Sequence, residues 1–146
     1  LRDAQVILVE QARRLDEAGD AYTTDDRDEL GRMLLNVDCP LEASAVLRTV
    51  VEERQDDPSL WRAYSVSLLR SGQRTLGVRA ARRERSLAPS SIHSMHNIAL
   101  AMIEEGRLRR AEVWLKRAIS AAPNDADIRR LRRRLRVAQF FKSFQG

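Results

Sequence analysis

Apolar and small residues recur along this chain at a fixed interval. Pro89 and Pro123 mark that interval, and the whole chain can be aligned on their spacing. A period of about 34 residues is typical of proteins built from stacked copies of one helical motif. The alignment gives three repeats, which are 24–57 (repeat 1), 58–91 (repeat 2) and 92–125 (repeat 3).

The aligned positions predict two helices in each repeat. Small residues at the eighth and twentieth positions let the two helices approach, and large residues nearby fill the adjacent holes. We therefore interpret Trp61, Tyr64, Met95 and Met102 as core residues. At positions 4, 7, 8, 11, 20, 24 and 27 the three repeats have Arg27, Trp61 and Met95; Leu30, Tyr64 and Ile98; Gly31, Ser65 and Ala99; Leu34, Leu68 and Met102; Ala43, Gly77 and Ala111; Leu47, Ala81 and Leu115; and Val50, Glu84 and Ala118.

Helix ends and flanking helices are also predicted. The first helix of each repeat should end near Asp38, Gly72 or Gly106, where glycine is favoured because it tolerates a left-handed backbone. Two more helices are expected, over 2–18 and 126–142, and we interpret them as caps on the exposed stacking faces. The first is alternatively the remnant of a further repeat. One side of the first carries Ala4, Leu8, Ala12 and Leu15; the second has an apolar stripe of Ile128, Leu131, Leu135 and Ala138, and starts at Asn124, Asp125 and Asp127.

These positions resemble the tetratricopeptide repeat, whose pattern is a large residue, Leu-Gly, a large residue, Ala, a large residue, Ala and Pro. The resemblance covers about 102 of the 146 residues and is weakest in repeat 1, where Arg27 and Gln55 depart from the pattern. It implies an all-α fold, a right-handed α-solenoid of antiparallel helix pairs. We expect a single domain over 1–146, with an N-terminal helix and loop in 1–23 and a C-terminal capping helix and tail in 126–146.

The resemblance also implies a function, because the first helices of such repeats line a concave groove that holds a peptide or helix of a partner. A clamp for the carboxyl terminus of heat-shock chaperones is not expected, since Asp28 and Ala63 stand at clamp positions and Asp28 would repel a carboxylate. A peptide with apolar anchors and some acidic residues would suit the groove. Its expected lining is Arg32, Leu35, Asn36, Arg62, Val66, Leu69, Arg70, His93, His96, Asn97, Leu100 and Ile103.

Charge is divided unevenly along the chain. Residues 1–57 hold 15 acidic and 7 basic residues, a net charge of −8, whereas 58–146 hold 6 acidic and 19 basic residues, a net charge of +13. Three interpretations of the basic end stay open: a solvated face, contact with an acidic partner or with another copy in a homo-oligomer, and binding of nucleic acid or an anionic membrane surface. This basic patch comprises Arg129, Arg130, Arg132, Arg133, Arg134 and Arg136.

Other features of the sequence leave alternatives open. Phe140, Phe141 and Phe144 follow the basic patch and either pack on the capping helix or form an exposed apolar end. Arginine supplies 24 of the 26 basic residues, which reflects genomic base composition or selection for bidentate recognition of carboxylate or phosphate. In plan, three repeats after an extra helix also resemble the small chaperones of bacterial type III secretion, although the basic character speaks against that role.

Candidates for catalysis are few, so we expect a non-catalytic protein without a metal or cofactor. Cys39 has no histidine near it in sequence, and His93 and His96 lack a third ligand at a suitable spacing. A single cysteine and the absence of an apolar run of about 18 residues favour a cytoplasmic protein, or the soluble part of a larger one. Because the chain begins with Leu1, we expect a fragment or a processed chain.

Overall fold

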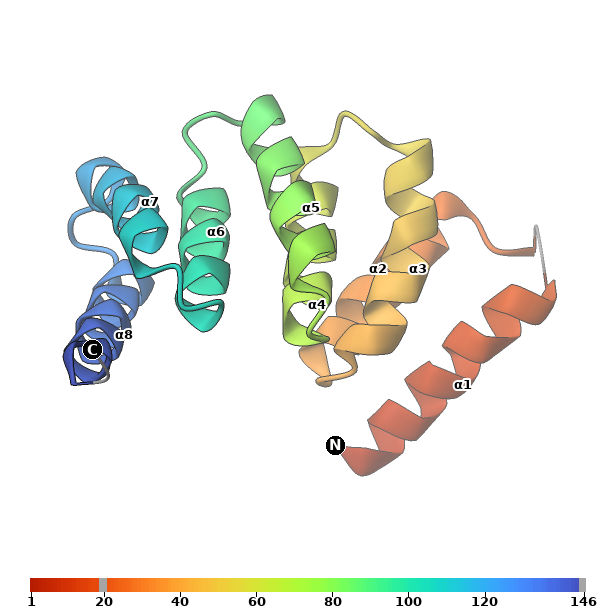
Figure 1. Ribbon diagram of the computed structural model, residues 1–146. Coiled ribbons are helices and arrows are strands. Elements are labelled where there is room, and N and C mark those ends of the chain that lie inside the picture. The colour runs from red at the N-terminus through yellow and green to blue at the C-terminus, as the bar shows by residue number, and fades with distance from the viewer. Residues whose placement is uncertain (19–20, 145–146) are drawn as a thin grey trace. The chain divides into compact units, whose positions relative to one another are not determined.

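The computed structural model describes residues 1–18 and 21–144, which form eight helices and no strand (Figure 1). The chain divides into two compact units, an N-terminal unit of Leu1–Ala80 and a C-terminal unit of Ala81–Gly146. The helices are α1 (Arg2–Ala18), α2 (Thr24–Asn36), α3 (Pro40–Glu53), α4 (Pro58–Arg70), α5 (Arg74–Leu87), α6 (Ile92–Glu104), α7 (Leu108–Ala121) and α8 (Ala126–Ser143). The boundary between the units falls within α5.

The helix bounds follow the predicted period. The first helices of the three repeats begin at Thr24, Pro58 and Ile92, and the second helices begin at Pro40, Arg74 and Leu108, so each series advances by one repeat length at every step. The all-α class and the helix pairs are therefore confirmed, together with the two flanking helices. The single domain over 1–146 stays a prediction.

Local sequence sets where the helices start and stop. Thr23 and Asp26 form a capping box at α2, since the Thr23 hydroxyl accepts from the Asp26 N–H and the Asp26 carboxylate accepts from the Thr23 N–H. Asp57, Ser91 and Asp125 cap α4, α6 and α8 through their side-chain oxygens. These caps satisfy backbone donors that the first helical turn leaves without partners.

The turns between paired helices share one backbone conformation. Asp38, Gly72 and Gly106 have positive φ values of 62°, 83° and 70°, and they occupy the same position of each repeat. After each, the next backbone N–H returns to a carbonyl of the first helix, as from Gln73 to Leu68 O at 2.8 Å. The left-handed residue thus ends the first helix and allows the second to run back along it.

The core of the N-terminal unit lies among α1, α2 and α3. Leu30, Leu34, Ala43 and Val46 form it with Leu8 and Leu15 of α1. Gln5 of α1 also donates a side-chain hydrogen bond of 2.6 Å to the carbonyl of Val37. α3 packs in turn against α4, where Leu60 contacts Val50 and Val51. α1 therefore covers one face of repeat 1, which fits both a cap and the remnant of a further repeat.

In the C-terminal unit, α6 packs against α7, and α8 packs against both. Met95 and Met102 are buried, as predicted, and Ile128, Leu131 and Leu135 turn the apolar stripe of α8 inward. Trp61 and Tyr64, in the N-terminal unit, are only half-buried, with their rings tilted at 59° and their centroids 6.2 Å apart. No helix among the described residues is long and apolar enough to cross a membrane.

Candidate interaction surfaces

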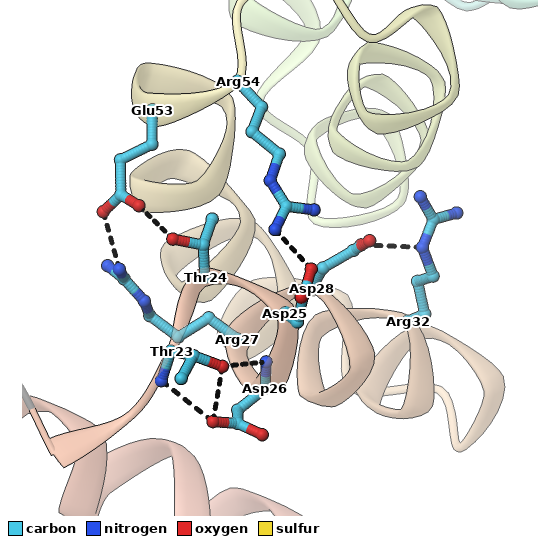
Figure 2. A network of polar contacts seen from close by, with 9 residues as sticks. All are labelled: Thr23, Thr24, Asp25, Asp26, Arg27, Asp28, Arg32, Glu53 and Arg54. Atoms are coloured by element: carbon cyan, nitrogen blue, oxygen red, sulfur yellow. Dashed lines mark hydrogen bonds and ion pairs between the residues drawn. The ribbon is translucent and has the colours of Figure 1, made fainter.

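In the N-terminal unit, an arginine joins the first helices of repeats 1 and 2. Arg32 of α2 donates to the carboxylate of Asp28 at 2.7 Å and to the hydroxyl of Ser59 on α4 at 3.2 Å. Figure 2 shows the Arg32 guanidinium turned toward Asp28. Asp28 is the residue that the sequence resemblance aligns with a position of the carboxylate clamp. Its ion pair occupies Arg32, so the two side chains neutralise each other.

A second arginine joins the carboxyl ends of the same helices. Arg70 of α4 donates to the carbonyl of Leu35 at 3.1 Å and to the carboxylate of Asp38 at 2.7 Å. The α2–α4 surface is therefore held by an arginine toward each end.

Between these two arginines, the expected groove residues differ in exposure. Leu35, Arg62 and Val66 are half-buried, and Asn36 is exposed. Leu69, in contrast, packs on α5, where a β-carbon added to Gly77 would stand 2.7 Å from Leu69 Cγ. The Leu69 side chain therefore packs between the paired helices α4 and α5. The repeat alignment, in contrast, places Leu69 at an exposed groove position.

A network of polar residues joins the start of α2 to the end of α3 (Figure 2). Arg27 donates to Glu53 at 2.6 Å, Thr24 also donates to Glu53, and Arg54 pairs with Asp25. Hydrogen bonds from Thr24 and then Arg27 hold the pKa of Glu53 below its ordinary value. The contact explains why Arg27 departs from the repeat pattern: at this outer repeat its position carries an ion pair instead of an apolar contact.

In the C-terminal unit, a small cleft of about 200 Å³ separates α6 from α8. The cleft combines apolar and charged side chains, with Leu100 and His96 on α6 facing the α8 side. His93 is exposed on the same helix. The lining residues are His96, Leu100, Asp127, Arg130, Leu131 and Arg134.

Two expected groove residues of α6 are buried. Asn97 and Ile103 are each 8% exposed, because α6 packs against both α7 and α8. The Asn97 side-chain oxygen lies 3.4 Å from His96 Nδ1, while its Nδ2 has no hydrogen-bond partner among the residues that the structure describes. Neither residue presents its side chain on an open surface, so the accessible lining of α6 is limited to His93, His96 and Leu100.

The basic patch on α8 contains paired and unpaired arginines. Arg134 donates to Glu104 at 3.2 Å and Arg130 to Asp127 at 3.3 Å. Arg129, Arg132, Arg133 and Arg136 are exposed and make no ion pair with any residue that the structure describes.

The aromatic end of α8 is exposed. Phe140, Phe141 and Phe144 are 60%, 62% and 72% exposed. Phe140 contacts its two neighbours edge-on, with centroid distances of 5.8 Å to Phe141 and 4.8 Å to Phe144. Of the two alternatives left open by the sequence, the structure shows the exposed apolar end.

Sequence reasoning missed two basic features of the C-terminal unit. A broad cleft of about 880 Å³, between the start of α7 and the end of α8, is lined partly by Arg107, Arg109, Arg110 and Lys142. Nearby in sequence, Trp114 of α7 has Arg85 and Arg117 over its ring, at 5.0 and 4.9 Å from the centroid. The cleft and the arginine contacts of Trp114 both depend on which helices pack together in the fold. No sequence motif indicates that packing.

Metal-ligating side chains and Cys39 were the candidates for chemistry in the sequence. No group of three or more His, Cys, Asp or Glu side chains among the described residues could hold a metal ion. Cys39 is half-buried, and burial, followed by the charges of Glu42 and Asp38, raises the pKa of its thiol. A raised pKa is the opposite of what a nucleophilic cysteine needs.

Structural comparison decides the fold. The chain is similar to YrrB, a TPR protein with an unusual peptide-binding site, with a TM-score of 0.76 at 17% identity over 86% of this chain and 64% of that one. The fold is that of the tetratricopeptide repeat. The chain thus spans less than two thirds of the length of YrrB.

Two further tetratricopeptide structures agree. The first TPR domain of human RPAP3 gives a TM-score of 0.74 at 15% identity, covering 84% of this chain and 97% of that one. The type III secretion chaperone SycD of Yersinia enterocolitica, solved with a peptide of the translocator YopD, gives 0.71 at 14% identity, covering 85% and 99%. Neither a protein-family model nor a curated protein matches the sequence.

Proposed function

We propose that this tetratricopeptide chain is a non-catalytic scaffold that binds a peptide or helix of a partner protein on the first helices of its repeats. The observation that carries the proposal is the same in both units. Apolar side chains of the first helices stay partly open to solvent beside fixed cationic groups: Val66 and Leu35 between Arg32 and Arg70, and Leu100 beside Arg130 and Arg134.

The chemistry of these surfaces indicates the kind of peptide. Half-buried leucine and valine side chains offer contacts to apolar anchors, and a few such anchors dominate the affinity of most interfaces. The flanking arginines would favour acidic residues between the anchors and disfavour basic ones. Two of the similar proteins bind peptides: YrrB has an unusual peptide-binding site, and SycD was solved with a peptide of YopD. This supports a role of this general class.

The experiment selects peptides from a random display library on the full chain and measures their affinity by calorimetry. Val66→Asp and Leu100→Asp each place a carboxylate on one of the two proposed surfaces. We expect at least one of these variants to weaken peptide binding about tenfold or more. Leu41→Asp on α3 and Val113→Asp on α7 are matched controls, because both residues are exposed on second helices. Equal losses in the controls, or unchanged affinity in both surface variants, would overturn the proposal.

A further inference from the structure

We propose that the outward face of α8 binds the surface of a membrane rich in anionic lipids, separately from the peptide-binding surfaces. The proposal rests on two properties that meet on this one face. It carries a stripe of exposed aromatic and aliphatic side chains, and it carries arginines that have no acidic partner within the described ranges 1–18 and 21–144.

α8 has a second apolar stripe, opposite the one that packs on its unit. Ile128, Leu131 and Leu135 are 1–3% exposed and face α6 and α7. The outward stripe begins at Val137, which is 54% exposed, and its members follow at intervals of three, one and three residues, so they lie on one side of the helix. The outward stripe comprises Val137, Phe140, Phe141 and Phe144.

Positive charge continues the same face toward the start of α8. Arg136 lies four residues before Phe140, Arg133 seven residues before it, and Arg129 four residues before Arg133, which are the intervals of one helix face. All three are exposed without an ion pair in the described part of the chain. Residues 128–144 contain seven basic residues and no acidic one. The face therefore has no internal counter-charge.

An anionic bilayer offers a binding partner for the arginines and for the apolar stripe at the same time. Lipid headgroups attract the arginines, and the acyl boundary directly below them accepts the phenylalanine rings. A protein partner would have to offer a groove that is both apolar and acidic to fit this convex helix. Nucleic acid would satisfy the arginines, but Phe140 contacts the rings of Phe141 and Phe144 edge-on, so the three rings do not present separate faces to bases.

A second copy of this chain is the main competing occupant, because residues 1–57 are acidic. At least five of those fifteen acids, however, have partners within the N-terminal unit that the structure identifies. They include Asp25 with Arg54, Asp26 with Thr23, Asp28 with Arg32, Asp38 with Arg70, and Glu53 with Arg27. Association through Asp25, Asp28, Asp38 or Glu53 would break an existing ion pair, whereas an anionic bilayer requires no such exchange.

The test is co-sedimentation of the full chain with phosphatidylcholine vesicles that contain either no anionic lipid or about one third phosphatidylglycerol. We expect binding to the anionic vesicles only, weakening as ionic strength rises. The triple variant Phe140→Ser/Phe141→Ser/Phe144→Ser should bind at least about tenfold more weakly. Arg129→Gln/Arg133→Gln/Arg136→Gln should lose about 100-fold, or about fivefold per arginine.

Matched controls separate this face from general charge and hydrophobicity. Arg48→Gln/Arg79→Gln/Arg82→Gln removes the same charge from exposed arginines of α3 and α5, and Leu41→Ser/Leu76→Ser/Val113→Ser removes exposed apolar side chains of the second helices. Each control should change vesicle affinity less than about threefold. In Phe141→Trp, tryptophan emission should shift to shorter wavelength with anionic vesicles, by more than the unsubstituted chain shows.

Four results would overturn the proposal. The first is equal binding to neutral and anionic vesicles, and the second is an equal loss in the α8 variants and their controls. The third is no binding to either kind of vesicle. The fourth is concentration-dependent self-association without lipid that the α8 variants abolish, which would assign the face to a second copy.

Discussion

Leu47 lies so close to Gly31 that a β-carbon at position 31 would stand 2.6 Å from Leu47 Cγ. Gly31 belongs to α2 and Leu47 to α3, so this contact sets how closely the two helices of repeat 1 approach. Leu47 is completely buried. The glycine of the repeat pattern is therefore required here for packing.

Gly31→Ala should destabilise the chain by about 1–3 kcal/mol, because the added methyl group overpacks the α2–α3 contact. The measurement is the free energy of unfolding from a denaturant titration followed by circular dichroism. In a Leu47→Ala background the same substitution should be neutral or should stabilise by up to about 1 kcal/mol, since alanine is the better helix former. A similar cost in both backgrounds would show that Leu47 is not the cause.

Gly72→Ala and Gly106→Ala should each cost about 1–2 kcal/mol, because both positions have the left-handed backbone that a β-carbon disfavours. No atom lies within 4 Å of an added β-carbon at either position, so the cost comes from backbone conformation alone. Gly72→Asn and Gly106→Asn serve as comparisons, since asparagine tolerates this conformation better. The midpoint temperature of thermal unfolding should be highest with glycine, lower with asparagine and lowest with alanine. Equal midpoint temperatures for alanine and glycine would refute the explanation.

Stability should fall in acid through Asp26 and Glu53. Hydrogen bonds from the Thr23 side chain and backbone depress the pKa of Asp26, and those from Thr24 and Arg27 depress the pKa of Glu53. Because the folded-state pKa values lie below the ordinary 3.8 and 4.5, both contributions are complete above those values and are lost as the pH falls through the folded-state values. The measurement is the free energy of unfolding from denaturant titrations at about pH 6, 4 and 3. Asp26→Asn and Glu53→Gln should each flatten the decline, and an unchanged slope would contradict it.

Cys39 should react slowly with thiol reagents. Burial and the neighbouring carboxylates of Glu42 and Asp38 raise the pKa of its thiol, so at pH 8 the reactive thiolate is scarcer than in a free cysteine. The rate of disulfide exchange with an aromatic disulfide reagent should lie below that of glutathione and rise with pH. Glu42→Gln should speed the reaction modestly by removing one negative charge. A native rate above that of glutathione would contradict the assignment.

The period of the chain was sufficient to predict where helices begin and end, because the signals involved are local. A capping residue, a proline or a left-handed turn acts within one helical turn of its own position, and α2, α4 and α6 each start at the first position of a repeat. Which side chains would be exposed on the surface was harder to predict from the sequence. Ile103 and Asn97 occupy positions expected to be open, but their burial depends on how α7 and α8 pack against α6.

Two further residues show the same limit. Glu84 stands where repeat 3 has an alanine, and the structure buries it completely. Its carboxylate accepts a 2.6 Å hydrogen bond from Ser91, the cap of the next helix, a pairing that no periodic pattern encodes. Leu69 was expected in the groove but fills the space above Gly77. In both, the decisive neighbour lies on another helix.

The shared conformation at Asp38, Gly72 and Gly106 has a consequence for how such a chain can change in length. Because each hairpin reverses direction through the same backbone geometry, a duplicated or deleted block of one repeat length, cut at these points, would join through a turn that already exists. Unequal recombination at the level of the gene would then leave the order of helix and turn intact. The array is in this sense extensible, and repeat number can vary in evolution without the invention of a new connection.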